Sequence, residues 1–298
     1  MGLKDRLSRP PWRTLFLLAA VAALLPLAYL AWSPGLRVID GRNDLRTNGL
    51  WLQHGWLADD AWLARNGKDT ARFRTPDALR SLADRLRGHG IRDLFPHACP
   101  CGADGALPPH DNAQVERFLD HMDGFRVIPW IGGRLGANAR INSPEWRARF
   151  AGSAATLLRD HPRLAGAQVN IEPLPSGNAD YPALLDELRR ALPAGKLLSV
   201  AAYPPPTRWQ PSLEVHWEEP YFRQVASRVD HLTVMMYDTG LQWRKIYQRL
   251  MADWTSEALS WAGGKEVLLG VPAYDDAGVG YHAPAVERLE HALPGIHA

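Results

Sequence analysis

Hydrophobic and polar residues follow two periodic patterns that alternate along most of the chain. Short apolar runs of strand type recur, and the segments between them have apolar residues three and four positions apart, the spacing of an amphipathic helix. We predict strands at 49–56, 91–98, 125–133, 164–173, 196–204, 231–238 and 266–275. We predict helices at 75–90, 112–124, 143–162, 180–195, 218–230, 243–264 and 284–298. Several of these helices open on Ser, Thr, Asp or Asn, which favour helix N-termini.

This alternation predicts an α/β fold with a parallel sheet covered by helices. Seven strand–helix units over residues 49–298 fit a (β/α)8 TIM barrel better than a doubly wound sheet. No GxGxxG motif follows the first strand, which argues further against a dinucleotide-binding fold. Strand eight is missing from the pattern. We expect either a natural chain that continues past Ala298 or a barrel left open, and we favour the first.

The N-terminus predicts an exported chain. Residues 1–13 carry four basic side chains, and residues 14–32 form a run of 19 residues without a charge. That run is long enough to cross a bilayer as a helix, with the basic tail in the cytoplasm. A cleaved signal peptide is the alternative. In both cases the linker at 33–48 and the domain at 49–298 lie on the periplasmic or extracellular side.

Composition narrows the choice of partner. The chain is 46% hydrophobic and 22% charged, as in globular proteins, and its net charge of +2 gives no reason to expect a nucleic-acid partner. Cys99 and Cys101 have one residue between them, which predicts a loop with free thiols or a strained disulfide. His97 and His110 flank them without zinc-type ligand spacing. We therefore predict no metal and no cofactor, and we interpret His54 and His97 as structural.

The candidate chemistry lies at the C-terminal ends of the predicted strands, where TIM barrels place their active sites. Gln168, Asn170 and Glu172 alternate in one strand, so they share a face. The other strand ends supply His54, Trp56, His97, Trp130, Tyr203, Met236, Tyr237, Asp238, Tyr274, Asp275 and Asp276. A carboxylic acid beside aromatic rings is typical of a cleft that cleaves sugars, where the acid protonates the leaving oxygen.

Three motifs resemble glycoside hydrolase family 18, the chitinases and their relatives. The run "LAGAQVNIEPLP" is similar to the strand-four signature Asp-Gly-x-Asp-x-Asp-x-Glu of that family, with Gly166 on its glycine and Glu172 on its proton-donating glutamate. "MMYD" (235–238) resembles the strand-six Met-x-Tyr-Asp, and "GVPAYD" (270–275) resembles the strand-seven Gly-x-Pro-x-Tyr. The aspartates of the signature fall on Ala165, Gln168 and Asn170.

The resemblance implies substrate-assisted hydrolysis of N-acetylhexosamine glycans, such as chitin-like polymers or peptidoglycan. Glu172 would be the general acid and base. Asn170 would orient the acetamido group, as the asparagine of family 85 endo-β-N-acetylglucosaminidases does, and Tyr237 would donate to its carbonyl oxygen. The expected substrate contacts are Asp238, Gln168, Trp56, Trp130, Tyr203, Met236, Tyr274 and Asp275.

Other interpretations stay open. The loss of the aspartates favours a glycan-binding lectin on the same barrel, or a structural component of an envelope polysaccharide system. Glu172 is also compatible with a barrel-mouth ion pair, Gln168 with an interior polar residue, and Tyr237 and Asp238 with caps of their strand.

Overall fold

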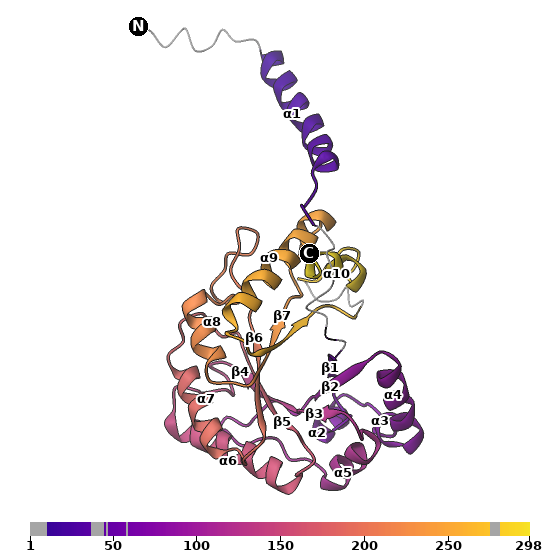
Figure 1. The fold of residues 1–298 in the computed structure, drawn as a ribbon, viewed down its shortest axis with the longest axis vertical. Helices are drawn as coiled ribbons and strands as arrows, with labels where there is room; N and C mark the ends of the chain where they lie inside the picture. The colour runs from indigo at the N-terminus through magenta and orange to yellow at the C-terminus, as the bar shows by residue number, and fades with distance from the viewer. Residues whose placement is uncertain (1–10, 37–44, 46, 58, 275–280) are drawn as a thin grey trace.

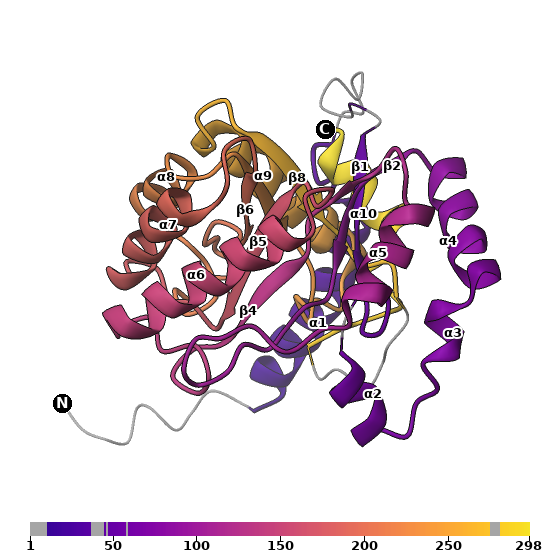
Figure 2. The ribbon, with the colours of Figure 1, turned by 90° about the horizontal axis from the view of Figure 1, so that it is seen from below.

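The strands form two parallel sheets with helices on the outside (Figures 1 and 2). The computed structural model describes residues 11–36, 45, 47–57, 59–274 and 281–298. One sheet has the order β1 (Asn48–Leu52), β2 (Ile91–Pro96) and β3 (Arg126–Val127). The other has the order β4 (Trp130–Arg134), β5 (Gly166–Glu172), β6 (Leu197–Ala202), β7 (His231–Met235) and β8 (Glu266–Gly270). All pairings are parallel, as the strand–helix alternation predicts.

β3 and β4 together occupy one strand position between β2 and β5. The predicted run at 125–133 is interrupted at Pro129, which has no N–H to donate. The backbone N–H of Ala165 still donates to the carbonyl oxygen of Val127 over 2.8 Å, and that of Gln168 to Pro129 over 2.9 Å. The eight labelled strands therefore fill seven positions of a TIM-barrel-like arrangement.

Helices follow the strands in the predicted order. They are α4 (Pro76–Gly88), α5 (Asn112–His121), α6 (Pro144–Asp160), α7 (Asp180–Ala191), α8 (Glu219–Ala226) and α9 (Arg244–Trp261). Two short helices, α2 (Asp60–Arg65) and α3 (Ala71–Arg74), precede α4, and α10 (Leu289–Ile296) packs on α9. Capping fixes several helix starts: the Thr75 hydroxyl accepts from the N–H of Ala78, and that of Ser143 from the N–H of Trp146.

The ring is open between β1 and β8, because no backbone pairing joins these two strands among the described residues. An ionic network crosses the opening at the N-terminal ends of the strands. Asp93 on β2 is fully buried and accepts from Arg126 and Arg92, and both arginines also contact Glu266 on β8. Burial opposes the shift, but the hydrogen bonds from Arg126 and Arg92 lower the pKa of Asp93. The network ties β8 to β2 across β1.

Most of helix α1 (Pro11–Ala31) projects away from the TIM-barrel-like domain (Figure 1). Its stretch Thr14–Ala31 is long and apolar enough to cross a membrane, and none of it is buried. Its C-terminal end touches the start of α9: the Lys245 ammonium donates to the carbonyl oxygens of Tyr29, Leu30 and Trp32 at 3.0, 2.9 and 2.7 Å. A lysine near the last carbonyls stabilises a helix C-terminus.

Candidate active site

Glu172 ends β5 and is paired with Asn170 on the same face of the strand. The Asn170 Nδ2 donates to Glu172 Oε1 over 2.8 Å, and the Tyr203 hydroxyl donates to Glu172 Oε2 over 3.4 Å. Asn170 Oδ1 is buried and accepts no hydrogen bond from the described residues. Burial raises the pKa of Glu172, although the bonds from Asn170 and Tyr203 work against that shift. The carboxyl group therefore keeps its proton to a higher pH than an exposed glutamate does.

Tyr237 follows β7 and lies close enough to Glu172 for the carboxylate charge to act on the Tyr237 hydroxyl. Its ring packs edge-on against Trp51, with centroids 6.0 Å apart. Burial first, and then the charge of Glu172, raises the pKa of Tyr237 well above that of a free phenol. The same causes raise the pKa of Tyr203. Both phenols stay protonated, so both are hydrogen-bond donors at this end of the barrel.

Asp238 is a second carboxylate at the C-terminal ends of the strands, three residues after the end of β7. It has a positive φ of 55°, a conformation that aspartate tolerates better than most residues, and it accepts from the Tyr274 hydroxyl over 2.7 Å. His282 Nδ1 lies 3.5 Å from Asp238 and 3.7 Å from the buried Glu287. Glu287 in turn accepts from the backbone N–H groups of Thr239, Gly240 and Ala283. This arrangement fixes the loop that carries Asp238.

The remaining predicted contacts fall into two groups. Gln168 and Met236 have no exposed surface. The Gln168 amide accepts from Trp51 Nε1 and donates to Ser199 and Thr233, which matches the interior-polar interpretation. Trp130 is half-buried, and its Nε1 has no hydrogen-bond partner among the described residues. Trp56 lines a cavity of about 310 Å³ with Phe73 that does not include Glu172. Asp275 and Asp276 lie outside the described residues.

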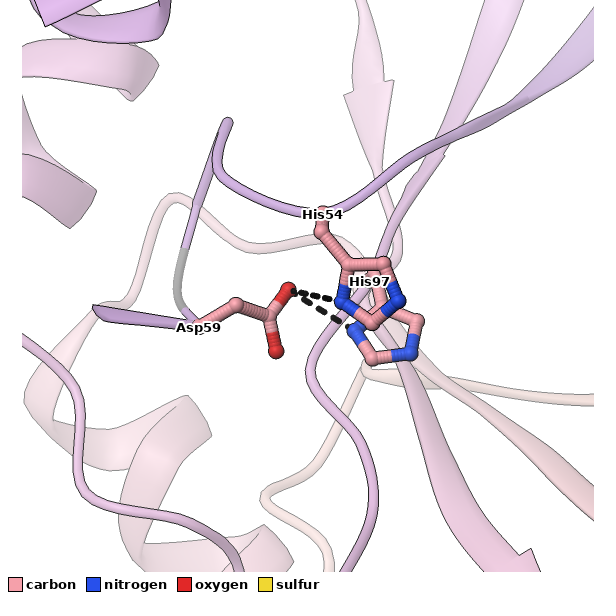
Figure 3. A group of neighbouring side chains, drawn as sticks. All are labelled: His54, Asp59 and His97. Atoms are coloured by element: carbon pink, nitrogen blue, oxygen red, sulfur yellow. Dashed lines mark hydrogen bonds and ion pairs between the residues drawn. The ribbon is translucent and has the colours of Figure 1, made fainter. Parts of the chain in front are cut away.

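His54 and His97 meet at an aspartate that the sequence pattern did not single out (Figure 3). His97 Nδ1 lies 2.8 Å and His54 Nδ1 3.2 Å from the same oxygen, Oδ2 of Asp59. The ring of His54 stacks on Trp62 at 3.9 Å, and the ring of His97 meets Trp130 edge-on at 4.3 Å. Burial and the neighbouring His97 lower the pKa of His54. The structure therefore places both histidines, which the sequence analysis interprets as structural, in a group of possible metal ligands.

The family model for glycosyl hydrolases family 18 matches residues 103–281, more than half of the 298 residues. The chain belongs to glycosyl hydrolases family 18. A search of curated proteins gave no match.

Several solved structures resemble the chain at low identity. The spore cortex-lytic enzyme SleL of Bacillus cereus has a TM-score of 0.50 and 16% identity, over 65% of this chain and 46% of SleL. A chitinase from Chromobacterium violaceum has a TM-score of 0.48 and 17% identity, over 76% of this chain and 68% of that chain. The chain covers less than two thirds of several such structures. At these identities the likeness to SleL supports the fold alone.

The family 18 region contains Glu172, Tyr237 and Tyr274, whereas His54, Asp59 and His97 all precede it. Asp59 was missed because it is the first residue of "DDAW" (59–62), a stretch that looks like an ordinary helix start. The one local signal was an aspartate directly before a helix. Its contact with His97 spans 38 positions of sequence, which no periodicity records.

Proposed function

We propose that the chain is a glycoside hydrolase that cleaves N-acetylhexosamine glycans with help from the acetamido group of the substrate. The observation that carries the proposal is the Glu172–Asn170 pair: a half-buried acid held by an amide whose own oxygen is buried and has no hydrogen-bond partner among the described residues. Unpaired buried acceptors are rare in native structures and call for an explanation. A substrate N–H group would supply the missing hydrogen.

In the proposed first step, Glu172 gives its proton to the glycosidic oxygen as the bond to the anomeric carbon breaks. The acetamido carbonyl oxygen attacks the anomeric carbon and forms an oxazolinium ring. Asn170 Oδ1 accepts from the acetamido N–H, and Tyr237 donates to the attacking carbonyl oxygen. This route needs no second carboxylate as nucleophile, in line with the substrate-assisted exceptions among glycosidases.

In the second step, the Glu172 carboxylate takes a proton from water, and the resulting hydroxide attacks the anomeric carbon. The ring opens, the acetamido group is restored, and the configuration is retained. The raised pKa of Glu172 suits both steps, because one group must first give a proton to the leaving oxygen and then take another from water. Asp238, fixed by Tyr274, is placed to accept from sugar hydroxyls, and Trp130 offers an aromatic surface for a sugar ring.

Matched oligomers test the role of the acetamido group. The full chain in detergent is incubated with N-acetylglucosamine oligomers, with the same oligomers after N-deacetylation, and with peptidoglycan. We expect new reducing ends only where acetamido groups are present, and a first product of retained configuration by NMR. Equal cleavage of the deacetylated oligomers, or an inverted product, would contradict the substrate-assisted mechanism.

The lectin interpretation rests on the replacement of the family's aspartates by Ala165, Gln168 and Asn170. Under that alternative the chain binds the N-acetylated oligomers without producing reducing ends. The retained glutamate, half-buried and with a raised pKa, favours hydrolysis.

We also propose that α1 anchors the domain on the exported side of a membrane. Tyr29 packs edge-on against Trp243 at 5.0 Å, beside Lys245. Tyr29 lies near the end of α1, and Trp243 and Lys245 lie at the start of α9 beside it. Tyrosine, tryptophan and lysine side chains are typical of the membrane–water boundary. Alkaline carbonate extraction tests this: an anchored chain stays with the membranes, and a cleaved one appears as a shorter soluble product.

A further inference from the structure

The cluster of His54, Asp59 and His97 lies at the C-terminal ends of the first two strands. His54 follows β1, His97 follows β2, and Asp59 directly precedes α2. Figure 3 shows both imidazoles turned toward one carboxylate. Three potential donor atoms, two Nδ1 and one Oδ2, thus converge on one point, with separations of 2.8 and 3.2 Å from the carboxylate oxygen. All three atoms lie within 4.8 Å of one another.

Asp59 does not perform the role that its position predicts. An aspartate before a helix normally accepts from the N–H groups of the first turn. The Asp59 side chain makes no such capping bond to α2. It turns instead to the two imidazoles, and only 2% of the side chain is exposed. Its position is therefore explained by the histidines and not by the helix.

The charge of this carboxylate is poorly compensated. The polar side chains that contact it are the two imidazoles, and no lysine or arginine forms an ion pair with Asp59 among the described residues. A buried carboxylate is costly unless it is paired with a cation or binds a metal ion. A divalent cation would balance the charge of Asp59.

We propose that His54, Asp59 and His97 bind a divalent transition-metal ion, with Zn²⁺ the best match. Zinc binds imidazole nitrogen and carboxylate oxygen at about 2.0–2.2 Å, so neighbouring ligands of a tetrahedral ion lie about 3.3 Å apart. The observed separations from Oδ2 are close to this spacing. Two histidines and one carboxylate also bind transition-metal ions in preference to calcium or magnesium, which prefer oxygen ligands.

The surroundings suit a site with one open position. Trp62 and Trp130 hold the two rings from the sides, which orients the ligands. The side chain of His54 is 29% exposed, so the ion is reachable from solvent. The fourth ligand would be water or a hydroxyl or carboxylate oxygen of a bound glycan.

The site also lies near the proposed hydrolytic pair. His97 forms a β-bridge with Trp130, and Trp130 is the register partner of Gln168, two residues before Asn170 on β5. An ion there would lie at the same mouth of the barrel as Glu172. Its binding does not depend on hydrolysis, so the two proposals can fail separately.

Calorimetry on the untagged full chain in detergent tests the site. The chain is freed of metal with a chelator and titrated with Zn²⁺, and Co²⁺ absorption spectra report on the ligand field. We expect one ion per chain, and binding weakened at least about 100-fold by Asp59→Asn or His97→Gln. Asp186→Asn is the control, because it removes an exposed carboxylate that belongs to no histidine–carboxylate cluster, and it should bind Zn²⁺ as the wild type does.

His54→Gln covers the case in which the more buried variants fail to fold, since His54 is partly exposed. We expect it to bind Zn²⁺ at least about 10-fold more weakly, with an unchanged circular dichroism spectrum. An absence of Zn²⁺ binding by the wild type would overturn the proposal. So would Zn²⁺ binding that all three variants retain at the wild-type affinity.

Discussion

Asn170 Nδ2 donates to Glu172 over 2.8 Å, while the Asn170 side-chain oxygen is buried and has no hydrogen-bond partner in the part of the chain that the structure describes. An aspartate at position 170, as in the family signature, would instead bring a second negative charge beside Glu172. The asparagine holds the acid without that charge, so the pKa of Glu172 is raised mainly by burial. Under the proposed mechanism, the amide orients the acetamido group of the substrate, while burial controls the proton on Glu172.

The first prediction concerns Asn170 itself. Asn170→Ala should lower kcat on N-acetylglucosamine oligomers by about 100-fold or more, because it removes an oriented hydrogen-bonding group at the reacting centre. Asn170→Asp should retain turnover and extend activity to higher pH, since a second carboxylate nearby raises the pKa of Glu172 further. Steady-state kinetics across pH check both. Equal kcat in Asn170→Ala and wild type would remove Asn170 from the mechanism.

The second prediction is the sign of the pH dependence. The pKa of Glu172 is raised from 4.5 in the folded chain, so the folded state holds this proton more tightly than the unfolded state. The free energy of unfolding therefore falls as pH rises from the unfolded pKa of Glu172, 4.5, through its folded pKa. Glu172→Gln should be more stable than the wild type above this window and equal to it below, by urea unfolding at a series of pH values. A variant less stable at neutral pH would contradict the burial argument.

Activity should depend on the same proton. Because the general acid must be protonated to start the reaction, kcat/KM should fall as pH rises through the pKa of Glu172. The alkaline limb of the pH profile should lie above the pKa of an exposed glutamate. An alkaline limb at the ordinary glutamate value would show that burial does not control this group.

The third prediction concerns the network that spans the opening between β1 and β8. Asp93→Asn leaves Arg126 and Arg92 without the charge of their buried partner and should cost about 3–5 kcal/mol in the free energy of unfolding. Since the pKa of Asp93 is lowered, this stabilisation is present above the unfolded value of 3.8 and is lost as pH falls through the folded pKa. Asp186→Asn, which breaks a surface pair with Arg228, is the control and should cost less than about 1 kcal/mol.

The fourth prediction concerns Gly132 on β4. Its φ of +143° is a glycine conformation, and a Cβ there would overlap the backbone carbonyl of Asn170 on the neighbouring strand. Gly132→Ala should cost more than about 2 kcal/mol and displace Asn170, so activity should fall with stability. Gly152→Ala on the exposed face of α6 meets no neighbouring atom and should stabilise the chain by about 0.5–1 kcal/mol. Thermal unfolding of both variants checks the contrast.

Most of the fold was predictable because it depends on local patterns. The seven strand positions, their parallel pairing and the shared face of Asn170 and Glu172 follow from residue periodicity. The interruption at Pro129 was visible in the sequence as well, but its effect on the pairing was not predicted. The predicted helix at 284–298 begins later, at Leu289, because Glu287 turns its carboxylate toward three backbone N–H groups upstream.

The contacts that were missed join residues far apart in the chain. Arg92 and Glu266 are separated by 174 positions, and His97 and Asp59 by 38. Gln168 lies on the same face of β5 as Asn170, yet its side-chain amide is hydrogen-bonded to Trp51, Ser199 and Thr233 in the interior. Periodicity indicates which face a residue shares, but not how deep along the barrel axis the residue lies. That depth distinguishes the interior Gln168 from the pair at the mouth.

The most direct test of the account is turnover and binding by Glu172→Gln, with Glu214→Gln on an exposed loop as the control. Both full-length variants are assayed on N-acetylglucosamine oligomers and peptidoglycan, and affinity is measured by calorimetry. We predict that Glu172→Gln loses at least about 1,000-fold in kcat and keeps its affinity, while Glu214→Gln matches the wild type. Turnover by Glu172→Gln at the wild-type rate would contradict the account, and a wild type that binds these glycans without turnover would make the chain a lectin.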